Sequence, residues 1–223
     1  MIQILSSYGW LLLRALGQTC LLALWGLFFG SLVGLIFGIL GVMKNKVCQY
    51  IQSVFVNIIR GVPLIVLAYF VFFGVPYAFK NILGVDVTLS ALQAGTICLA
   101  LNSGAYMAEI IRAGIQSVDK GQMEAARSLG LPYWRAMQRI VLPQAIRTMI
   151  PTIVNQFIIT LKDTSILSAI GFPELVNSAK NVVANTFMSF QTWLVVGIMY
   201  LIIITILSWV AKRLERRLAR GRE

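Results

Sequence analysis

Polar and charged residues interrupt two of the long apolar runs in this sequence, and their spacing is regular. Asn102, Tyr106 and Glu109 stand at i, i+4 and i+7, which places them on one face of a helix. A second group, Lys162–Ser165 (KDTS), falls near the middle of another apolar run. An ionised side chain at the centre of a bilayer costs at least ~2.5–3.5 kcal/mol, so such residues usually face a cavity or a partner. The two groups therefore predict a polar cavity between two membrane-spanning helices.

The residues that line this predicted cavity follow from their helical positions. Lys162 and Asp163 are adjacent, so their side chains point about 100° apart and cannot face one cavity equally. We expect Asp163 to line the cavity, with Lys162 neutralising it or bonding backbone carbonyl groups. The candidate binding residues are Asn102, Tyr106, Glu109, Asp163 and Thr164.

Three of these residues have an alternative, structural explanation. Glu109 could pair with Arg112, one helical turn later, near the membrane interface. Asn102 and Tyr106 could form hydrogen bonds that hold neighbouring helices together. Both alternatives stay open at the level of sequence.

The elements that would position these residues are long apolar segments. Of the 223 residues 58% are hydrophobic and only 12% are charged, whereas soluble chains usually carry about 25% charged residues. A membrane-spanning helix needs about 20 apolar residues. We therefore predict an all-α membrane protein, residues 1–223 forming a single domain of five transmembrane helices. The five segments are Ala15–Met43, Phe55–Phe79, Leu89–Ile115, Met149–Ile170 and Thr192–Ala211.

The distribution of Lys and Arg predicts the orientation of these helices, because cytoplasmic loops are enriched in both. With five spans, fifteen basic residues fall on one side and three on the other, with Lys162 inside a span. The N-terminus is therefore expected outside and the C-terminus in the cytoplasm. The fifteen are Lys44, Lys46, Arg60, Arg112, Lys120, Arg127, Arg135, Arg139, Arg147, Lys212, Arg213, Arg216, Arg217, Arg220 and Arg222, and the three are Arg14, Lys80 and Lys180.

Two further patterns concern helix packing. Glycines recur at near-helical spacing in the first predicted span, which allows close approach of another helix, either within the chain or between subunits. The segment Phe172–Phe187 places four apolar residues on one helical face and predicts either a helix on the external surface or an ordinary connecting helix. The glycines are Gly26, Gly30, Gly34, Gly38 and Gly41, and the four apolar residues are Leu175, Ala179, Val182 and Val183.

The segment between the third and fourth predicted spans, residues 116–148, is polar and too long for a simple turn. Gln122–Leu129 has high helix propensity, and Gly130 suits a helix end followed by a turn. Pro132 suits the first turn of a second helix, which we expect to run to a chain break at Pro143. The sequence predicts a short helix–turn–helix lying across the membrane face.

A sequence motif occupies this segment. EAARSLG (Glu124–Gly130) is followed by nine residues and then by IVLP (Ile140–Pro143). This resembles the EAA loop of ABC importer permeases, whose pattern is EAA, three residues, Gly, nine residues and Ile-x-Leu-Pro. The resemblance implies a type I ABC importer permease fold with a cytoplasmic EAA coupling helix that seats in an ATPase subunit. The coupling residues that it implies are Glu124, Ala125, Ala126, Arg127, Gly130, Leu142 and Pro143.

Two other segments extend the resemblance, which covers most of residues 10–211. Arg60–Leu64 (RGVPL) is similar to the RGTPL segment that opens the second span of polar amino-acid permeases. Leu161–Ser165 (LKDTS) is similar to the LKDTS or LKNTS segment of their fourth span. Val62 replaces the commoner Thr, and Leu67-Ala68 stands where many relatives carry a Gln, which leaves the substrate more open. The chain thus resembles the permease subunit of polar amino-acid ABC importers of the histidine/glutamine/arginine type.

This resemblance implies import of a polar, cationic or zwitterionic amino acid by alternating access across a bacterial cytoplasmic (inner) membrane. Glu109 and Asp163 would offer carboxylates to an ammonium or guanidinium group. Asn102, Thr164 or backbone N–H groups would bind the carboxylate of the substrate. The implied partners are a dimer of ABC ATPase subunits, a second permease chain (identical or similar), an extracytoplasmic amino-acid-binding protein and membrane lipid.

Several kinds of chemistry are excluded or assigned to other chains. The sequence has no histidine and three scattered cysteines, so no metal site is predicted. It has no GxxxxGK[ST] loop, so we expect no enzyme activity from this chain, and ATP and Mg to bind the partner ATPase. Its basic residues flank apolar runs rather than forming one polar surface, so nucleic acid is not an expected partner. The alternatives are an ion-coupled secondary transporter, with Glu109 or Asp163 carrying a proton, and a scaffold that only recruits cytoplasmic proteins.

Overall fold

The computed structural model describes the backbone of residues 2–219 and the side chains of residues 2–213, and it contains helices and no strand within that range. The side chains of Arg216, Arg217, Arg220 and Arg222, predicted on the cytoplasmic side, lie outside the described part. The elements are α1 Ile2–Val42, α2 Lys46–Gly61, α3 Leu64–Tyr69, η1 Phe70–Gly74, α4 Val75–Leu83, α5 Ala91–Gln116, α6 Lys120–Ser128, α7 Tyr133–Ala136, η2 Met137–Val141, α8 Leu142–Asp163, η3 Thr164–Ile170, α9 Leu175–Thr186 and α10 Ser189–Ala219.

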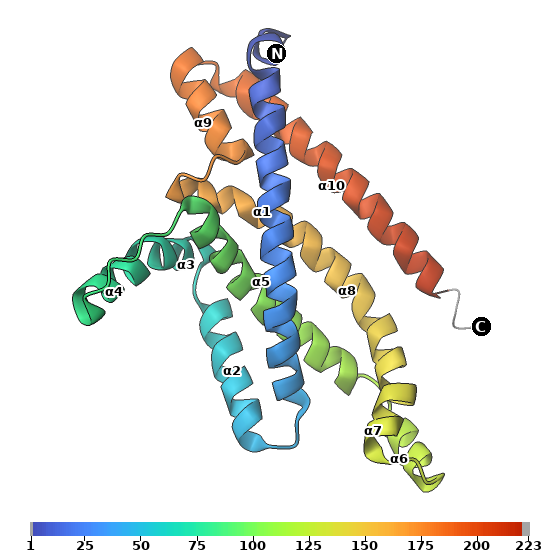
Figure 1. The fold of residues 1–223 in the computed structure, drawn as a ribbon. Helices are drawn as coiled ribbons and strands as arrows, with labels where there is room; N and C mark the ends of the chain where they lie inside the picture. The colour runs from blue at the N-terminus through green and yellow to red at the C-terminus, as the bar shows by residue number, and fades with distance from the viewer. Residues whose placement is uncertain (1, 220–223) are drawn as a thin grey trace.

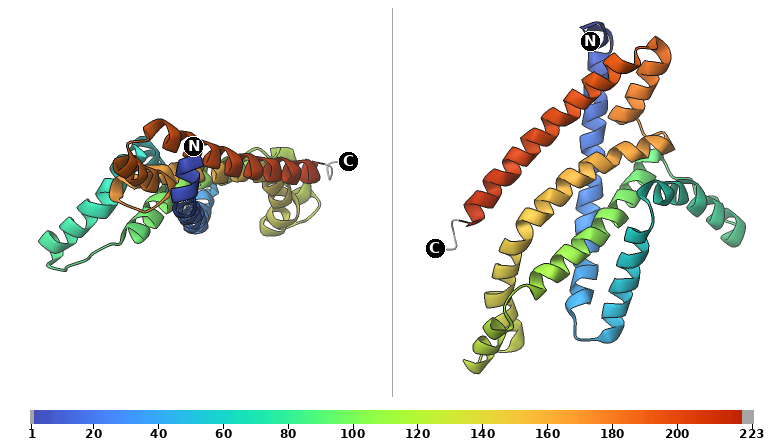
Figure 2. Two further views of the ribbon diagram at one scale, coloured as in Figure 1. Left: turned by 90° about the horizontal axis from the view of Figure 1, so that it is seen from above. Right: turned by 180° about the vertical axis from the view of Figure 1, so that it is seen from behind.

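The helices spread out around α1, which runs through the middle of the molecule (Figure 1). The N-terminus and α9 lie at one end, whereas α6, α7 and the turn between α1 and α2 lie at the other. Seen from above, the molecule is elongated and thin, with α4 and the end of α10 pointing in opposite directions (Figure 2). Such an open arrangement leaves many large apolar side chains uncovered in the single chain.

The glycines of the first span form an internal contact, which settles one alternative left open by the sequence. A Cβ atom placed on Gly26, Gly30, Gly34 or Gly38 would collide with a side chain of α5. Ser103 of α5 donates a hydrogen bond from its hydroxyl to the carbonyl of Gly26 at 3.1 Å. Small residues let two helix backbones approach closely, and α1 and α5 form the most extensive helix pair among the described residues.

Four helical stretches among the described residues are long and apolar enough to cross a membrane. They correspond to the first, second, third and fifth predicted spans. The helix of the fourth, α8, has sufficient length but is not among the stretches that are apolar enough, so its crossing stays a prediction. The four stretches are Ile2–Val42, Leu64–Leu83, Ala91–Gln116 and Ser189–Arg213.

The boundaries of the second predicted span, Phe55–Phe79, are wrong. Helix α2 ends at Gly61, and a new helical run begins at Leu64. Val62 adopts an extended conformation, with φ −98° and ψ 130°, because a residue before proline is driven out of the α region. Pro63 therefore separates two helices where hydropathy alone suggests one.

The segment Phe172–Phe187 contains the expected helix, α9, at the same end of the molecule as the N-terminus (Figure 1). Its buried face, Leu175, Ala179 and Val182, packs against α1 and α10. Glu174 is fully buried and caps the helix, accepting hydrogen bonds from the backbone N–H groups of Val176 at 2.8 Å and of Asn177 at 2.6 Å. Tyr200 of α10 donates its phenolic hydrogen to the same carboxylate at 3.2 Å. These bonds hold α9 onto the bundle.

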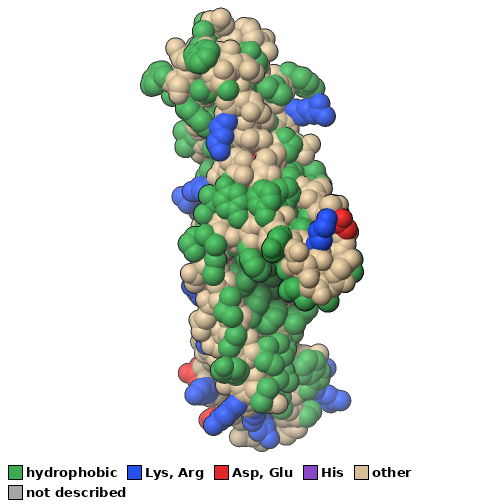
Figure 3. Space-filling model, turned by 90° about the vertical axis from the view of Figure 1, so that its left-hand side faces the viewer, with side chains coloured by type: hydrophobic (Ala, Val, Ile, Leu, Met, Phe, Trp, Pro, Cys, Tyr) green, Lys and Arg blue, Asp and Glu red, His purple; other side chains and the backbone are tan. Residues whose placement is uncertain are grey.

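The long polar segment forms two short helices joined by a turn at Gly130, whose φ is +85°. Pro132 directly precedes α7, as expected for the start of the second helix. The expected chain break at Pro143 is absent, because the π-helix η2 continues directly into α8. Pro143 is the second residue of α8 and follows directly on the π-helix η2, an irregularity of the kind that accompanies a proline without a backbone N–H inside a continuous helical run. Figure 3 shows Lys and Arg side chains gathered at this end, below a largely hydrophobic surface.

Candidate functional site

A polar cavity lies where the break between α2 and α3 faces α5 and the end of α8. Its volume is about 400 Å³. It is lined by Arg60, Gly61, Val62, Pro63, Leu64, Asn102, Tyr106, Ile159 and Asp163. The structure thus brings together Asn102, Tyr106 and Asp163, three of the five residues predicted from their spacing.

Local sequence explains how each wall of this cavity is placed. Ser90 and Gln93 form a capping box that starts α5, and the helix then carries Asn102 and Tyr106 one turn apart on the same face. Helix α8 ends at Asp163, where the chain tightens into the 3₁₀ turn η3. The extended backbone at Val62 and Pro63 forms the third wall.

Asn102 and Asp163 face each other across the cavity. Asn102 is buried, and its amide nitrogen lies 3.5 Å from a carboxylate oxygen of Asp163, at the outer limit of a hydrogen bond. Asp163 is half-buried and takes part in no ion pair within the described part of the chain. An ionised carboxylate in such a place is available to a positively charged group.

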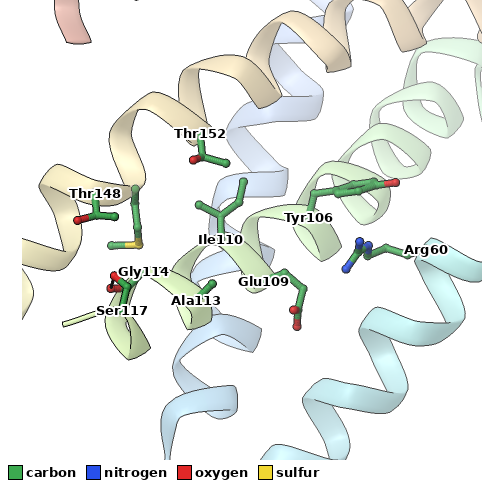
Figure 4. Close-up of a pocket in the computed structure, with 10 residues that line it drawn as sticks. Arg60, Tyr106, Glu109, Ile110, Ala113, Gly114, Ser117, Thr148 and Thr152 are labelled. Carbon is green, nitrogen blue, oxygen red and sulfur yellow. Dashed lines mark hydrogen bonds between the residues drawn. The ribbon is translucent and has the colours of Figure 1, made fainter. Parts of the chain in front are cut away.

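Glu109 lies in the next turn of α5, beside this cavity rather than in it. Its carboxylate accepts hydrogen bonds from Arg112 at 2.8 and 3.2 Å and from Gln52 of α2 at 2.8 Å. The pairing with Arg112 considered from the sequence is therefore the arrangement observed. Glu109 also lines two neighbouring cavities, of about 460 and 320 Å³, the larger of which is shown in Figure 4.

Arg60 was not among the residues predicted to bind a ligand. From the sequence we counted Arg60 with Lys46 among the basic residues of one membrane side. In the structure the two residues lie near opposite ends of α2, about 20 Å apart along the helix axis. Its guanidinium lies over the ring of Tyr106, 4.8 Å from the ring centroid, and it lines all three cavities (Figure 4). An arginine inside a predicted span was the signal that could have identified it.

Three residues of the KDTS group, Lys162, Thr164 and Ser165, do not line the cavity. Thr164 is fully buried, and its hydroxyl donates to the carbonyl of Leu161 at 2.7 Å. The side chain of Lys162 is exposed in the single chain. Polar residues that the prediction also missed are Ser117, Thr148 and Thr152, which line the largest of the three cavities on α5 and α8 (Figure 4).

The residues of the EAA pattern form a separate surface at the far end of the molecule. Glu124, Ala125 and Arg127 are exposed on α6, whereas Ala126 packs inward. Gly130 is exposed in the turn after α6, and Leu142 and Pro143 begin α8. In α7, Tyr133 lies under the ammonium group of Lys44, 5.8 Å from the ring centroid, which links this surface to the α1–α2 turn.

No group of His, Cys, Asp or Glu within the described residues is arranged to hold a metal ion. The lining of the cavity offers charge, hydrogen bonding and the aromatic face of Tyr106. Together with the apolar helices around it, this defines a polytopic membrane protein with a small polar cavity between its helices.

Comparison with known proteins assigns the family. Residues 26–220 match the family described as binding-protein-dependent transport system inner membrane component. The glutamine transport system permease protein GlnP of Escherichia coli K12 is 36% identical over 208 residues, 93% of each chain. The probable amino-acid ABC transporter permease protein PatM of Vibrio harveyi is 34% identical over 214 residues, 94% of each chain. The chain belongs to this family of inner membrane transport components.

Solved structures agree with the family. One described as an amino acid ABC transporter with histidines superposes with a TM-score of 0.88 and 34% identity, covering 97% of this chain and 98% of the other. An inward-facing MetNI methionine ABC transporter gives a TM-score of 0.76 at 21% identity, covering 94% and 96% of the two chains. The second likeness concerns the fold alone, and both match the type I ABC importer permease fold expected from the sequence.

Proposed function

We propose that this chain is the membrane-spanning subunit of an ATP-driven importer that moves a polar, zwitterionic or cationic amino acid. The observation that carries the proposal is the polar cavity between α2, α5 and α8 in a chain of this transport family. Its relatives include permeases named for glutamine and amino-acid transport, and its cavity offers both charged and amide groups.

The proposed binding residues differ in how directly the structure supports them. Asn102, Tyr106 and Asp163 line the cavity and would contact the substrate in the conformation observed. Glu109 would have to exchange its partners Arg112 and Gln52 to do so. Thr164 would have to turn out of its buried bond to Leu161. Contact from the last two residues stays a prediction.

Energy would come from other subunits. We infer that α6 and α7 dock on an ABC ATPase dimer, which binds ATP and Mg and moves this surface when it closes. The support is the exposure of Glu124, Ala125 and Arg127 on one short helix, carrying the motif that resembles a coupling loop.

Two chains would be needed to enclose a path, because the helices of the single chain form an elongated, thin arrangement (Figure 2). A second permease, identical or similar, would complete it, and an extracytoplasmic binding protein would deliver the substrate. The end bearing the N-terminus and α9 would face outside, and the basic end would face the cytoplasm.

The test is ATP hydrolysis by the tagged chain purified with the proteins that accompany it from its own membranes. We expect vanadate-sensitive hydrolysis that rises with one amino acid from a panel and with the binding protein, and that is lost in Glu124→Ala. Absence of an accompanying ATPase, together with uptake that follows a proton gradient, would favour the ion-coupled alternative. Membership of this family does not support that alternative.

A further inference from the structure

An apolar groove with a volume of about 480 Å³ lies between α1, α5, α8 and α10. Eleven of the twelve residues that line it are apolar, and the twelfth is Ser31. Leu24, Phe28 and Val210 in its lining are exposed in the single chain. Among the described residues, no charged side chain lines the groove. The groove therefore suits an apolar chain rather than a polar substrate.

The groove and the polar cavities lie on opposite faces of α8. Val154 and Phe157 line the groove, whereas Thr152 and Asp163 line the polar cavities. At about 100° per residue, the two pairs of side chains point about 160° apart around the helix axis. A second permease chain that completes the polar path would lie on the cavity side of α8, which leaves the groove facing the surrounding membrane. This step alone rests on the proposed function.

Positive charges stand at one end of the groove. Lys212 and Arg213 directly follow Ala211, a groove residue, and they end the apolar stretch of α10. Both side chains are exposed, and the guanidinium of Arg213 lies over the ring of Trp209, 5.1 Å from its centroid. Trp, Lys and Arg at the end of a spanning helix are typical of the level of the lipid headgroups.

The wall of the groove on α8 adds a further positive charge. Arg147 precedes Val154 by seven residues, which places it on the same helix face about 10 Å nearer the basic end of the molecule. Because Arg147 takes part in another interaction within the protein, it contributes charge to this end but is not assigned a ligand. The groove is thus apolar along its length and positive at the end that we expect to face the cytoplasm.

An amphipathic, anionic ligand matches this arrangement. Inside a bilayer an acyl chain enters an apolar groove at no hydrophobic cost, because the surrounding lipid is equally apolar. The charge of the headgroup then decides which lipid is preferred. Basic residues at the cytoplasmic surface attract anionic lipids, each raising the affinity about fivefold.

We propose that the groove binds an acyl chain of an anionic phospholipid, whose phosphate group contacts Lys212 and Arg213. The site lies beyond the proposed function, because it binds a membrane component rather than the transported substrate. A lipid held there fills the space between α10 and α1, and it supports the position of α10 without touching the polar cavities.

The experiment is photolabelling of the purified permease–ATPase complex in detergent with phosphatidylglycerol that carries a diazirine on one acyl chain. Labelled peptides are identified by mass spectrometry, and unlabelled phosphatidylglycerol or phosphatidylcholine with the same acyl chains competes for the site. We expect the label in segments 153–158 and 207–211, which line the groove. Phosphatidylglycerol should displace it at about 5- to 25-fold lower concentration than phosphatidylcholine, as expected for one or two basic contacts.

One pair of variants tests the groove itself. Ala211→Trp fills the groove and should abolish the label. Ile202→Trp makes a similar change at an exposed position of α10 outside the groove, and it should keep the label.

A second pair of variants tests the headgroup contacts. Lys212→Gln/Arg213→Gln should keep the label, and it should remove the 5- to 25-fold preference so that the two competitors act at about the same concentration. Lys46→Gln/Lys120→Gln removes two exposed charges at the same end of the molecule, neither of which lines the groove. This control should leave the preference unchanged.

Each outcome decides the question. Label retained in Ala211→Trp would place the lipid elsewhere and overturn the proposal. If that variant does not assemble, Ser31→Phe fills the groove from α1 and decides in the same way. Equal displacement by the two lipids in the wild-type complex would overturn the assignment to an anionic lipid.

Two further outcomes separate the groove from the dimer and from transport. Crosslinking of Val154→Cys to the second permease chain, in place of the lipid label, would show that a second copy occupies the groove and would overturn the proposal. A complex that takes the label in the groove, but whose ATPase responds to no amino acid, would support the lipid site while overturning the proposed function.

Discussion

At the scale of single residues, two ion pairs of this protein differ sharply in their surroundings. Arg112 and Glu109 are partly covered, with side chains 34% and 27% exposed, and Gln52 adds a third member to the pair. Lys80 and Asp86 are 64% and 72% exposed. Exposed pairs usually contribute little to stability, whereas a hydrogen-bonded pair that is partly covered contributes more.

Removing the covered pair should therefore destabilise the protein. We expect Glu109→Gln to lower the free energy of unfolding by about 1 kcal/mol, because the partial exposure of the pair limits its contribution. Lys80→Gln should leave the unfolding temperature unchanged. Thermal unfolding of both variants in the same detergent compares them directly, and equal shifts would contradict the structural difference between the pairs. Unchanged substrate preference in Glu109→Gln would remove Glu109 from the binding residues.

At the scale of elements, the packing of α1 on α5 depends on missing side chains. Gly34→Ala would place a Cβ against the side chain of Met107 and the backbone of Ala108. Overpacking of this kind costs about 1–3 kcal/mol, so we expect a clear loss of thermal stability. Gly17→Ala, on the same helix with no atom near the added Cβ, should instead be neutral or slightly stabilising. The same unfolding temperature for both variants would contradict the close approach of the two helices.

The cap of α9 gives a second prediction for an element. Glu174→Ala would leave two backbone N–H groups and the hydroxyl of Tyr200 without their acceptor, and should cost about 2–3 kcal/mol. Asn181→Ala changes an exposed side chain of the same helix and should have little effect. Limited proteolysis around α9, followed with thermal unfolding, distinguishes the two. If Glu174→Ala resists proteolysis as well as the wild type does, other contacts hold α9 in place.

The sequence predicts well those parts of the fold that depend on periodicity. Asn102 and Tyr106 reach one cavity because a regular helix places i and i+4 together. The position of Arg60 beside the cavity was missed because a hydropathy average treats the region around it as one continuous helix. It does not show the break between α2 and α3 that Val62 and Pro63 impose. Thr164 does not line the cavity in this structure because the chain tightens after Asp163 into a 3₁₀ turn, which rotates the next side chains away from their α-helical directions. Both departures from the expected arrangement occur where a helix stops being regular.

At the scale of the whole molecule, the two ends differ in charge and define an expected orientation. In a chain with Cys20, Cys48 and Cys98 replaced by Ala, a cysteine at position 180 on α9 should react in intact cells with a membrane-impermeant maleimide. A cysteine at position 120 on α6 should react only after the membrane is opened, because these two helices lie at opposite ends of the molecule (Figure 1). The reverse pattern would show that the basic end faces outside.

The glycine contacts between α1 and α5 have a mechanical consequence for transport. With side chains of one helix seated directly on the backbone of the other, the two helices cannot slide or separate without losing every contact together. We therefore expect α1 and α5 to move as one body during transport, carrying Asn102 and Tyr106 together. The walls of the cavity on α2 and α8 pack less extensively on this pair, and we expect them to move when access to the cavity changes.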